Sequence, residues 1–106
     1  MANDQDTKTH ITERFQTRID KLLPSNEAIP DPQLWMIKVD GEYVRLRSGK
    51  SSWRRIGHAK TALRNHFTGL SYHFGSGLNY KLANEVKEQL YQAFLKDRCE
   101  FIDLLA

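Results

Sequence analysis

The sequence has little of what a secreted or membrane-spanning protein needs. Cys99 is the only cysteine among 106 residues, so neither an internal disulfide nor a cluster of thiolate metal ligands can form. No apolar run approaches the roughly 20 residues that cross a bilayer. The N-terminus, Met-Ala-Asn-Asp-Gln-Asp, is polar and acidic, unlike a secretory signal. We therefore expect a cytoplasmic protein without a membrane partner, although a nuclear or viral protein inside a host cell would show the same pattern.

The sequence also lacks a recognisable catalytic or metal-binding set. No two of its four histidines have the i, i+4 spacing of a helical metal site, and His66, on the apolar side of its predicted helix, is interpreted as a packing residue. Apart from Arg98, Cys99 lacks the basic neighbours that activate a thiol. Residues 75–77, Gly-Ser-Gly, follow no strand and precede no Gly-Lys-Ser/Thr, so they do not form a phosphate loop. We predict a non-enzymatic protein with no cofactor and no metal.

Positive charge is concentrated in the middle of the chain. Residues 33–67 contain eight Lys or Arg and two Asp or Glu, a net charge of +6. The flanking residues 1–32 and 68–106 have net charges of −2 and −1. A polyanionic partner is favoured, because each phosphate that is neutralised releases counterions. The alternative is a basic surface over which the acidic flanks fold.

The pattern of apolar residues predicts an α+β fold with the order α-β-β-β-α-α. We expect a flexible N-terminus over residues 1–8 and a single domain over residues 9–106. Apolar residues at helical spacing predict a first helix from Thr9 to Leu23, which Pro24 ends because it has no amide hydrogen to donate. The same spacing predicts a second helix over residues 58–67 and a long last helix, whose apolar stripe extends to the C-terminus.

Two loops interrupt this pattern. Residues 25–32 contain two prolines and are predicted to form an ordered loop. Residues 68–77 contain three glycines among aromatic residues. This second segment is interpreted as a lid, a minor-groove probe or a simple connection.

Asp40-Gly41 lies between two runs of alternating β-forming residues, 34–39 and 42–47. Such a dipeptide favours a two-residue type I′ hairpin, since both turn positions need positive φ. The turn predicts that Lys38 faces Tyr43 and that Ile37 faces Val44. A second turn then leads to a short third strand over residues 52–56, which completes a three-stranded antiparallel meander packed against helices.

This register places basic and aromatic residues together on one sheet face. The opposite face, which carries Ile37 and Val44, is expected to pack against the helix over residues 58–67. Arginine and lysine can grip phosphates or base edges, and aromatic rings can stack on bases. The predicted nucleic-acid-binding residues, including two peripheral lysines, are Lys38, Tyr43, Arg45, Arg47, Lys50, Trp53, Arg55 and Lys60. The alternative is that a helix covers Trp35 or Trp53 and the arginines lie only at the rim.

The layout of residues 33–67 resembles the AP2-type and integrase N-terminal DNA-binding domains. The residues that carry this resemblance are Trp35, Arg45, Arg47, Trp53, Arg55 and the helix at 59–63. The resemblance implies that the sheet face reads the major groove of DNA. The order helix, three strands, helix is also similar to a double-stranded-RNA-binding domain, with residues 57–63 at the position of that family's lysine-rich helix start.

The function predicted first is therefore nucleic-acid binding, with DNA favoured over RNA. A second hypothesis is a small regulatory or inhibitory protein, such as a phage-type accessory factor, that binds a protein partner. This hypothesis rests on the long apolar stripe of residues 80–105, which could also pair with a second copy of the chain. The stripe consists of Leu82, Val86, Leu90, Phe94, Phe101 and Leu105.

Overall fold

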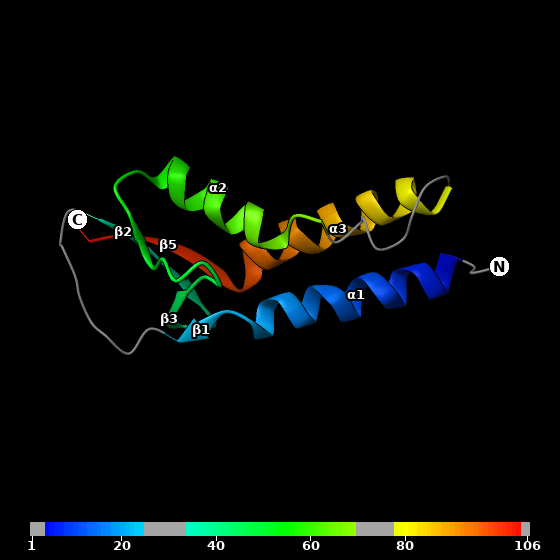
Figure 1. The fold of residues 1–106 in the computed structure, drawn as a ribbon, viewed down its shortest axis with the longest axis horizontal. Helices are drawn as coiled ribbons and strands as arrows, with labels where there is room; N and C mark the ends of the chain where they lie inside the picture. Colours follow the sequence, from blue (N-terminus) through cyan, green and yellow to red (C-terminus); the bar gives the residue numbers. More distant parts are fainter. Residues whose placement is uncertain (1–3, 25–33, 70–77, 105–106) are drawn as a thin grey trace.

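The computed structural model describes residues 4–24, 34–69 and 78–104 and shows an α+β fold (Figure 1). The predicted fold class is correct, but the order of the elements differs from α-β-β-β-α-α. In chain order the elements are α1 (Asp4–Asp20), β1 (Leu23–Pro24), β2 (Trp35–Val39), β3 (Glu42–Arg45), β4 (Ser52–Trp53), α2 (Ile56–Phe67), α3 (Leu78–Asp97) and β5 (Cys99–Asp103).

Strand β2 is the centre of the antiparallel sheet. β5 pairs with all five of its residues, from Trp35 to Val39. β3 pairs with β2 at Lys38 and Val39, and β4 pairs with it at Trp35 and Met36. Because a strand has only two edges, β3 and β4 must share the edge opposite β5. β1 then lies on the outer side of β3.

The β2–β3 hairpin has the predicted register. Lys38 pairs with Tyr43 across a turn in which Asp40 has φ 53° and Gly41 has φ 84°, as a type I′ turn requires. The turn is also fixed from outside, because the Asp40 amide donates to the Arg98 carbonyl oxygen at 2.9 Å. Arg98 Nε in turn donates to Asp40 Oδ1 at 2.9 Å, and this bond lowers the pKa of the Asp40 carboxyl.

The predicted third strand is corrected in both length and partner. Only Ser52 and Trp53 are extended, and they pair with β2 instead of with β3. The chain bends at Arg54 and Arg55, and α2 begins at Ile56. The alternation of side chains along a strand therefore ends at Trp53. The position of Ile56 cannot be used to infer which face of the sheet Trp53 occupies.

The predicted C-terminal extension of the last helix is wrong. α3 ends at Asp97, and residues 99–103 form β5. In β5, Cys99 lies opposite Val39 and Phe101 opposite Ile37, so the alternate residues Cys99 and Phe101 join the core face of the sheet. Phe101 follows Phe94 by seven residues, a spacing that also fits two helical turns, and this coincidence misled the helical interpretation.

The first helix begins earlier and ends earlier than expected. α1 starts at Asp4, so residues 4–8, predicted to be a flexible N-terminus, are helical. Thr9 therefore lies inside the helix, where its hydroxyl donates to the Gln5 carbonyl oxygen at 3.0 Å. The predicted loop over residues 25–32 and most of the one over 68–77 lie outside the described residues.

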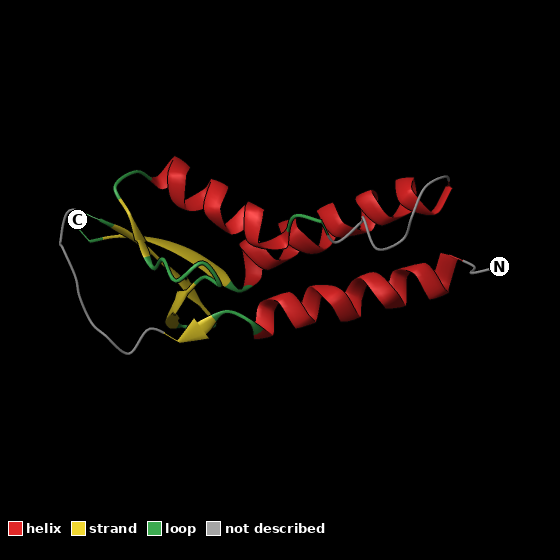
Figure 2. Cartoon of the chain, in the orientation of Figure 1, coloured by secondary structure: helices red, strands yellow, loops and turns green. Residues whose placement is uncertain are grey.

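α1 packs against α3 and α2, while α2 and the end of α3 pack against the sheet (Figures 1 and 2). α1 and α3 run side by side, with Ile11 against Ala83 and Val86. α2 packs on β2 and β4. The main core combines sheet residues with residues from all three helices. It contains Phe15, Ile19, Leu22, Ile37, Val39, Val44, Leu46, Trp53, Ala59, Leu63, Phe67, Tyr91, Phe94 and Cys99. None of the described helices is both long and apolar enough to cross a bilayer.

Cys99 should be protected from thiol reagents in the folded protein. Its side chain is buried beside β2, and burial raises the pKa of the thiol to about 12. Because the thiolate is the reacting species, we expect negligible labelling by a disulfide reagent at about pH 8 and rapid labelling after denaturation. Labelling of the native protein at the rate of an unfolded control would contradict the buried β5 strand.

The α2–α3 contact should show a pH-dependent stability. Arg64 donates two hydrogen bonds to Glu88, at 2.6 and 3.0 Å, and these bonds lower the pKa of Glu88 to about 2. The stabilisation is complete above the pKa of a free glutamate and is lost as the pH falls towards 2. Since both side chains are partly exposed, Glu88→Gln should cost less than about 1 kcal/mol in neutral urea melts.

The matched control for this measurement is Glu85→Gln, which removes an exposed carboxylate from the same helix. Its difference from the wild type should not depend on pH. Equal pH profiles for the two variants would contradict a stabilising Arg64–Glu88 pair.

Candidate nucleic-acid interface

Three of the predicted binding residues lie together on the sheet face that points away from the core. Lys38 and Tyr43 are cross-strand partners, and the Lys38 ammonium lies 4.9 Å from the centroid of the Tyr43 ring. Both are half-buried, whereas Arg45 is exposed. The sheet residues that join the helices in the core belong to the opposite face. No described helix therefore covers Lys38, Tyr43 and Arg45.

β5 changes the character of this outer face. Its pairing with β2 places Glu100 beside Lys38 and Ile102 beside Met36. Glu100 is exposed and Ile102 is half-buried. The face is therefore a mixed surface with a basic edge at β3, and it is less uniformly cationic than the hairpin alone indicates.

Trp53 does not lie on the outer face of the sheet. It pairs with Trp35 across β2 and β4, and side chains of paired residues point to the same face. Trp53 is 4% exposed and belongs to the core that includes Ile37. The predicted position of Trp53 assumed a strand over residues 52–56, but that strand ends at Trp53 and Ile56 is helical. Trp53 contributes apolar burial to the fold and offers no ring for stacking on a base.

The remaining predicted residues lie at three different places. Arg47 and Lys50 are in the loop after β3, which is closed by a 3.0 Å hydrogen bond from the Leu46 amide to the Lys50 carbonyl oxygen. Arg55 is the exposed N-cap residue of α2. Lys60, on α2, lies 5.7 Å from the Phe101 ring centroid. The eight predicted residues therefore do not share one face.

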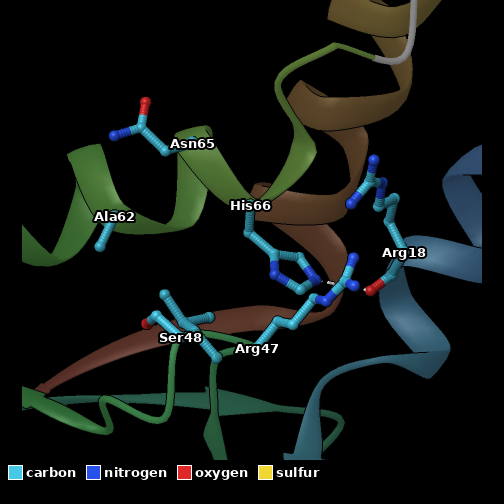
Figure 3. A pocket seen from close by; sticks show the side chains of 7 residues that line it. Arg18, Arg47, Ser48, Ala62, Asn65 and His66 are labelled. Atoms are coloured by element: carbon cyan, nitrogen blue, oxygen red, sulfur yellow. Dashed lines mark hydrogen bonds between the residues drawn. The ribbon is translucent and has the colours of Figure 1, made fainter.

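A cavity of about 540 Å³ joins the end of α1, the loop after β3 and α2. Its lining residues are Arg18, Leu46, Arg47, Ser48, Ala62, Asn65 and His66 (Figure 3). His66 lies at the centre of this arrangement, with Nε2 2.7 Å from the Arg18 carbonyl oxygen. That carbonyl belongs to the last turn of α1, where helical partners run out, and it also accepts a 3.3 Å hydrogen bond from the Lys21 amide. His66 therefore helps to cap α1.

The surroundings of His66 are positively charged. Burial is the main reason that its pKa is lowered, and the hydrogen bond to Arg18 opposes this shift. The charges of Arg18, Lys21 and Arg47 lower the pKa further. Three cations from two separate segments therefore act on one imidazole ring.

Two further cations belong to adjoining backbone segments, and the Arg45 side chain lies on the outer face of the sheet. In the β1–β3 pair, Arg45 lies opposite Leu23. Leu23 follows Lys21 by two residues in the chain. Lys50 closes the loop that carries Arg47. We call this set the basic junction. It consists of Arg18, Lys21, Arg45, Arg47 and Lys50.

Carboxylates near these elements are engaged elsewhere. Asp40 is bound by Arg98, and Glu88 is bound by Arg64. Asp20 accepts a hydrogen bond from Gln16 at 3.1 Å. In addition, the sequence contains no Asp or Glu from Tyr43 to Asn84. No described ion pair neutralises Arg18 or Arg47.

Sequence reasoning missed part of the site. Arg18 and Lys21 were counted with the acidic N-terminal flank, and only the pairing of β1 with β3 brings them to the basic segment. His66 was interpreted as a packing residue, and its ring does pack edge-on against Phe67. Nothing in the sequence indicated that its other edge borders a cavity. Among the described residues, no cluster of three potential metal-ligating side chains occurs.

Comparison of the chain with protein-family models, curated proteins and solved structures found no match. The resemblances to AP2-type, integrase N-terminal and double-stranded-RNA-binding domains therefore stay predictions.

The two tryptophans should differ in their access to solvent. In Trp35→Phe, all tryptophan emission comes from the buried Trp53, so we expect a blue-shifted spectrum and weak quenching by acrylamide. In the matched variant Trp53→Phe, the half-buried Trp35 should be quenched more strongly. Stronger quenching of Trp53 than of Trp35 would contradict its place in the core.

Proposed function

We propose that this protein is a non-enzymatic nucleic-acid-binding protein, with duplex DNA as the favoured target. The observation that carries the proposal is the basic junction, in which cations from α1, the turn after it, β3 and the next loop come together. Clustered cations attract the phosphate backbone, because binding releases the counterions that surround it. An exposed arginine can also hold a phosphate or a guanine edge with two hydrogen bonds.

The outer face of the hairpin supports the same function. Arg45 belongs both to the basic junction and to the face that carries Lys38 and Tyr43. A phosphate contact at the junction would therefore place Tyr43 near the same nucleic acid. Proteins can also contact the grooves of DNA with the strands of a β-sheet. This combination of phosphate-binding cations and a neighbouring aromatic ring favours nucleic acid over a protein surface.

The protein-partner hypothesis was based on the apolar stripe of residues 80–105, and much of that stripe packs within the chain. Val86 packs with Ile11 of α1, and Phe94 packs edge-on against Phe15. Phe101 and Ile102 belong to β5, where they pair with β2. In the described ranges, the large hydrophobic residues that remain exposed are Leu23 and Tyr80. A stripe that is used within the chain gives little support to dimerisation through residues 80–105.

Binding to labelled duplex DNA, single-stranded DNA and duplex RNA should show whether the basic junction holds phosphates. We expect affinity for duplex DNA to fall steeply with salt concentration. Arg45→Ala/Arg47→Ala should weaken binding and reduce the slope of log affinity against log salt by about 2, since two phosphate contacts are removed. Fluorescence anisotropy at several salt concentrations measures both quantities.

The control is Lys8→Ala/Lys81→Ala, which removes the same charge from exposed positions near the starts of α1 and α3. It should leave the slope nearly unchanged. An equal effect of the two double variants would show that only net charge matters and would contradict the assignment to the basic junction. Absence of binding to all three nucleic acids at low salt would overturn the proposed function.

A further inference from the structure

The cavity beside His66 has the chemistry of an anion-binding pocket. Arg18 and Arg47 both line it, and Figure 3 shows their guanidinium groups on the same side of the His66 ring. Ser48 lines it from the loop after β3 and provides a hydroxyl group. Asn65 also borders the cavity, but its amide points away from the two guanidinium groups in Figure 3. The polar side of the pocket is thus formed by Arg18, Arg47, Ser48 and His66.

The hydrogen bond to α1 fixes the tautomer of His66. A backbone carbonyl oxygen can only accept, so Nε2 must carry the hydrogen that it donates to Arg18, at 2.7 Å. In the neutral ring Nδ1 is then unprotonated, and Figure 3 shows it on the side of the loop that carries Ser48. Protonation at Nδ1 would add a third positive charge beside the two guanidinium groups, at the ring edge that faces away from them in Figure 3, and would leave the cap on α1 intact.

We propose that this pocket binds a phosphate group between Arg18 and Arg47, and that His66 takes up a proton at Nδ1 when the phosphate binds. Guanidinium groups match the oxygens of a phosphate with paired hydrogen bonds. Without a ligand, two like charges line one pocket and no described carboxylate forms an ion pair with either. A dianion would relieve this repulsion. The pocket, at about 540 Å³, lies in the range of small-ligand sites.

The proton uptake follows from the charges around His66. The groups that act on its charge are Arg18 on α1, Lys21 in the turn after it and Arg47 in the loop. All three are cations, and together with burial they lower the pKa of His66 in the free protein. A bound dianion would offset them and raise that pKa. Between the two values, binding takes up a proton, so the affinity must increase as the pH falls.

This inference goes beyond nucleic-acid binding, because it requires only a phosphate group. The probe for its test is sulfate, a tetrahedral dianion that does not itself titrate near neutral pH. We expect sulfate to shift the His66 ring signals in NMR spectra, and to bind more tightly at about pH 6 than at about pH 8. Arg47→Ala, at an exposed position, should weaken sulfate binding by about tenfold or more, because a charge-assisted contact is lost.

Two variants separate the pocket from general effects of charge and folding. Arg55→Ala removes an exposed cation outside the pocket and should leave sulfate binding unchanged. His66→Gln keeps an N–H donor for the Arg18 carbonyl but cannot take up a proton, so its sulfate affinity should not depend on pH. A wild-type His66 signal that does not respond to sulfate, or an Arg47→Ala variant that binds normally, would overturn the proposal. Binding that is equally tight at both pH values would overturn the proton uptake.

The source of the phosphate is identified with oligonucleotides that carry or lack a 5′-phosphate. A stronger His66 response to the phosphorylated strand would assign the pocket to a terminal phosphate, and an equal response would assign it to the phosphodiester backbone. Sulfate binding without nucleic-acid binding would support the pocket and contradict the proposed function. Nucleic-acid binding without a His66 response to sulfate would support the proposed function and contradict the phosphate pocket.

Discussion

The pairing of β5 with β2 is the constraint on which the rest of the structure depends. It occupies one complete edge of the central strand, so the two other strands that pair with β2 must share the remaining edge. It also brings the end of α3 to the hairpin turn, where Arg98 meets Asp40 through both backbone and side chain. A helix from one end of the chain and a hairpin from its middle are thereby held in one register. Because antiparallel partners share a face, this register also decides which side chains enter the core.

One consequence is that the two faces of the sheet carry different kinds of side chain. Every described helix that packs on the sheet does so on the face of Ile37 and Val44. Burial there requires apolar residues, and Trp53 joins them because its partner is Trp35. Lys38, Tyr43 and Arg45 lie on the other face, where Arg45 is exposed and Lys38 and Tyr43 are half-buried. The basic side chains of β2 and β3 therefore lie on the outer face of the sheet, and the pocket beside His66 lies on the helix side.

The hairpin was predictable because its determinants are local. Asp40 and Gly41 tolerate positive φ, and the alternation on either side fixes the register without further information. β5 was not predictable, since Cys99, Phe101 and Ile102 fit either a helical stripe or a strand, and only their contact with β2 decides between them. The basic segment was visible as a charge count, but the site combines Arg47 with Arg18 and Lys21, more than 20 residues away in the sequence. Such long-range proximity depends on the pairing of β1 with β3. β1 has only two residues, so it leaves no periodic pattern in the sequence that could be detected.

The repulsion between the cations at the end of α1 costs less free energy than their charges alone would indicate. The carbonyl groups at the C-terminus of a helix carry partial negative charge, which stabilises nearby cations such as Arg18 and Lys21. His66 caps one of those carbonyls with a neutral N–H, so the fold requires the ring but does not require its charge. The same ring then has a free nitrogen on the pocket side. One residue can thus hold α1 against α2 in every protonation state, while its second nitrogen changes charge in response to an anion. That separation allows a ligand to alter the electrostatics of the site without removing a contact on which the fold depends.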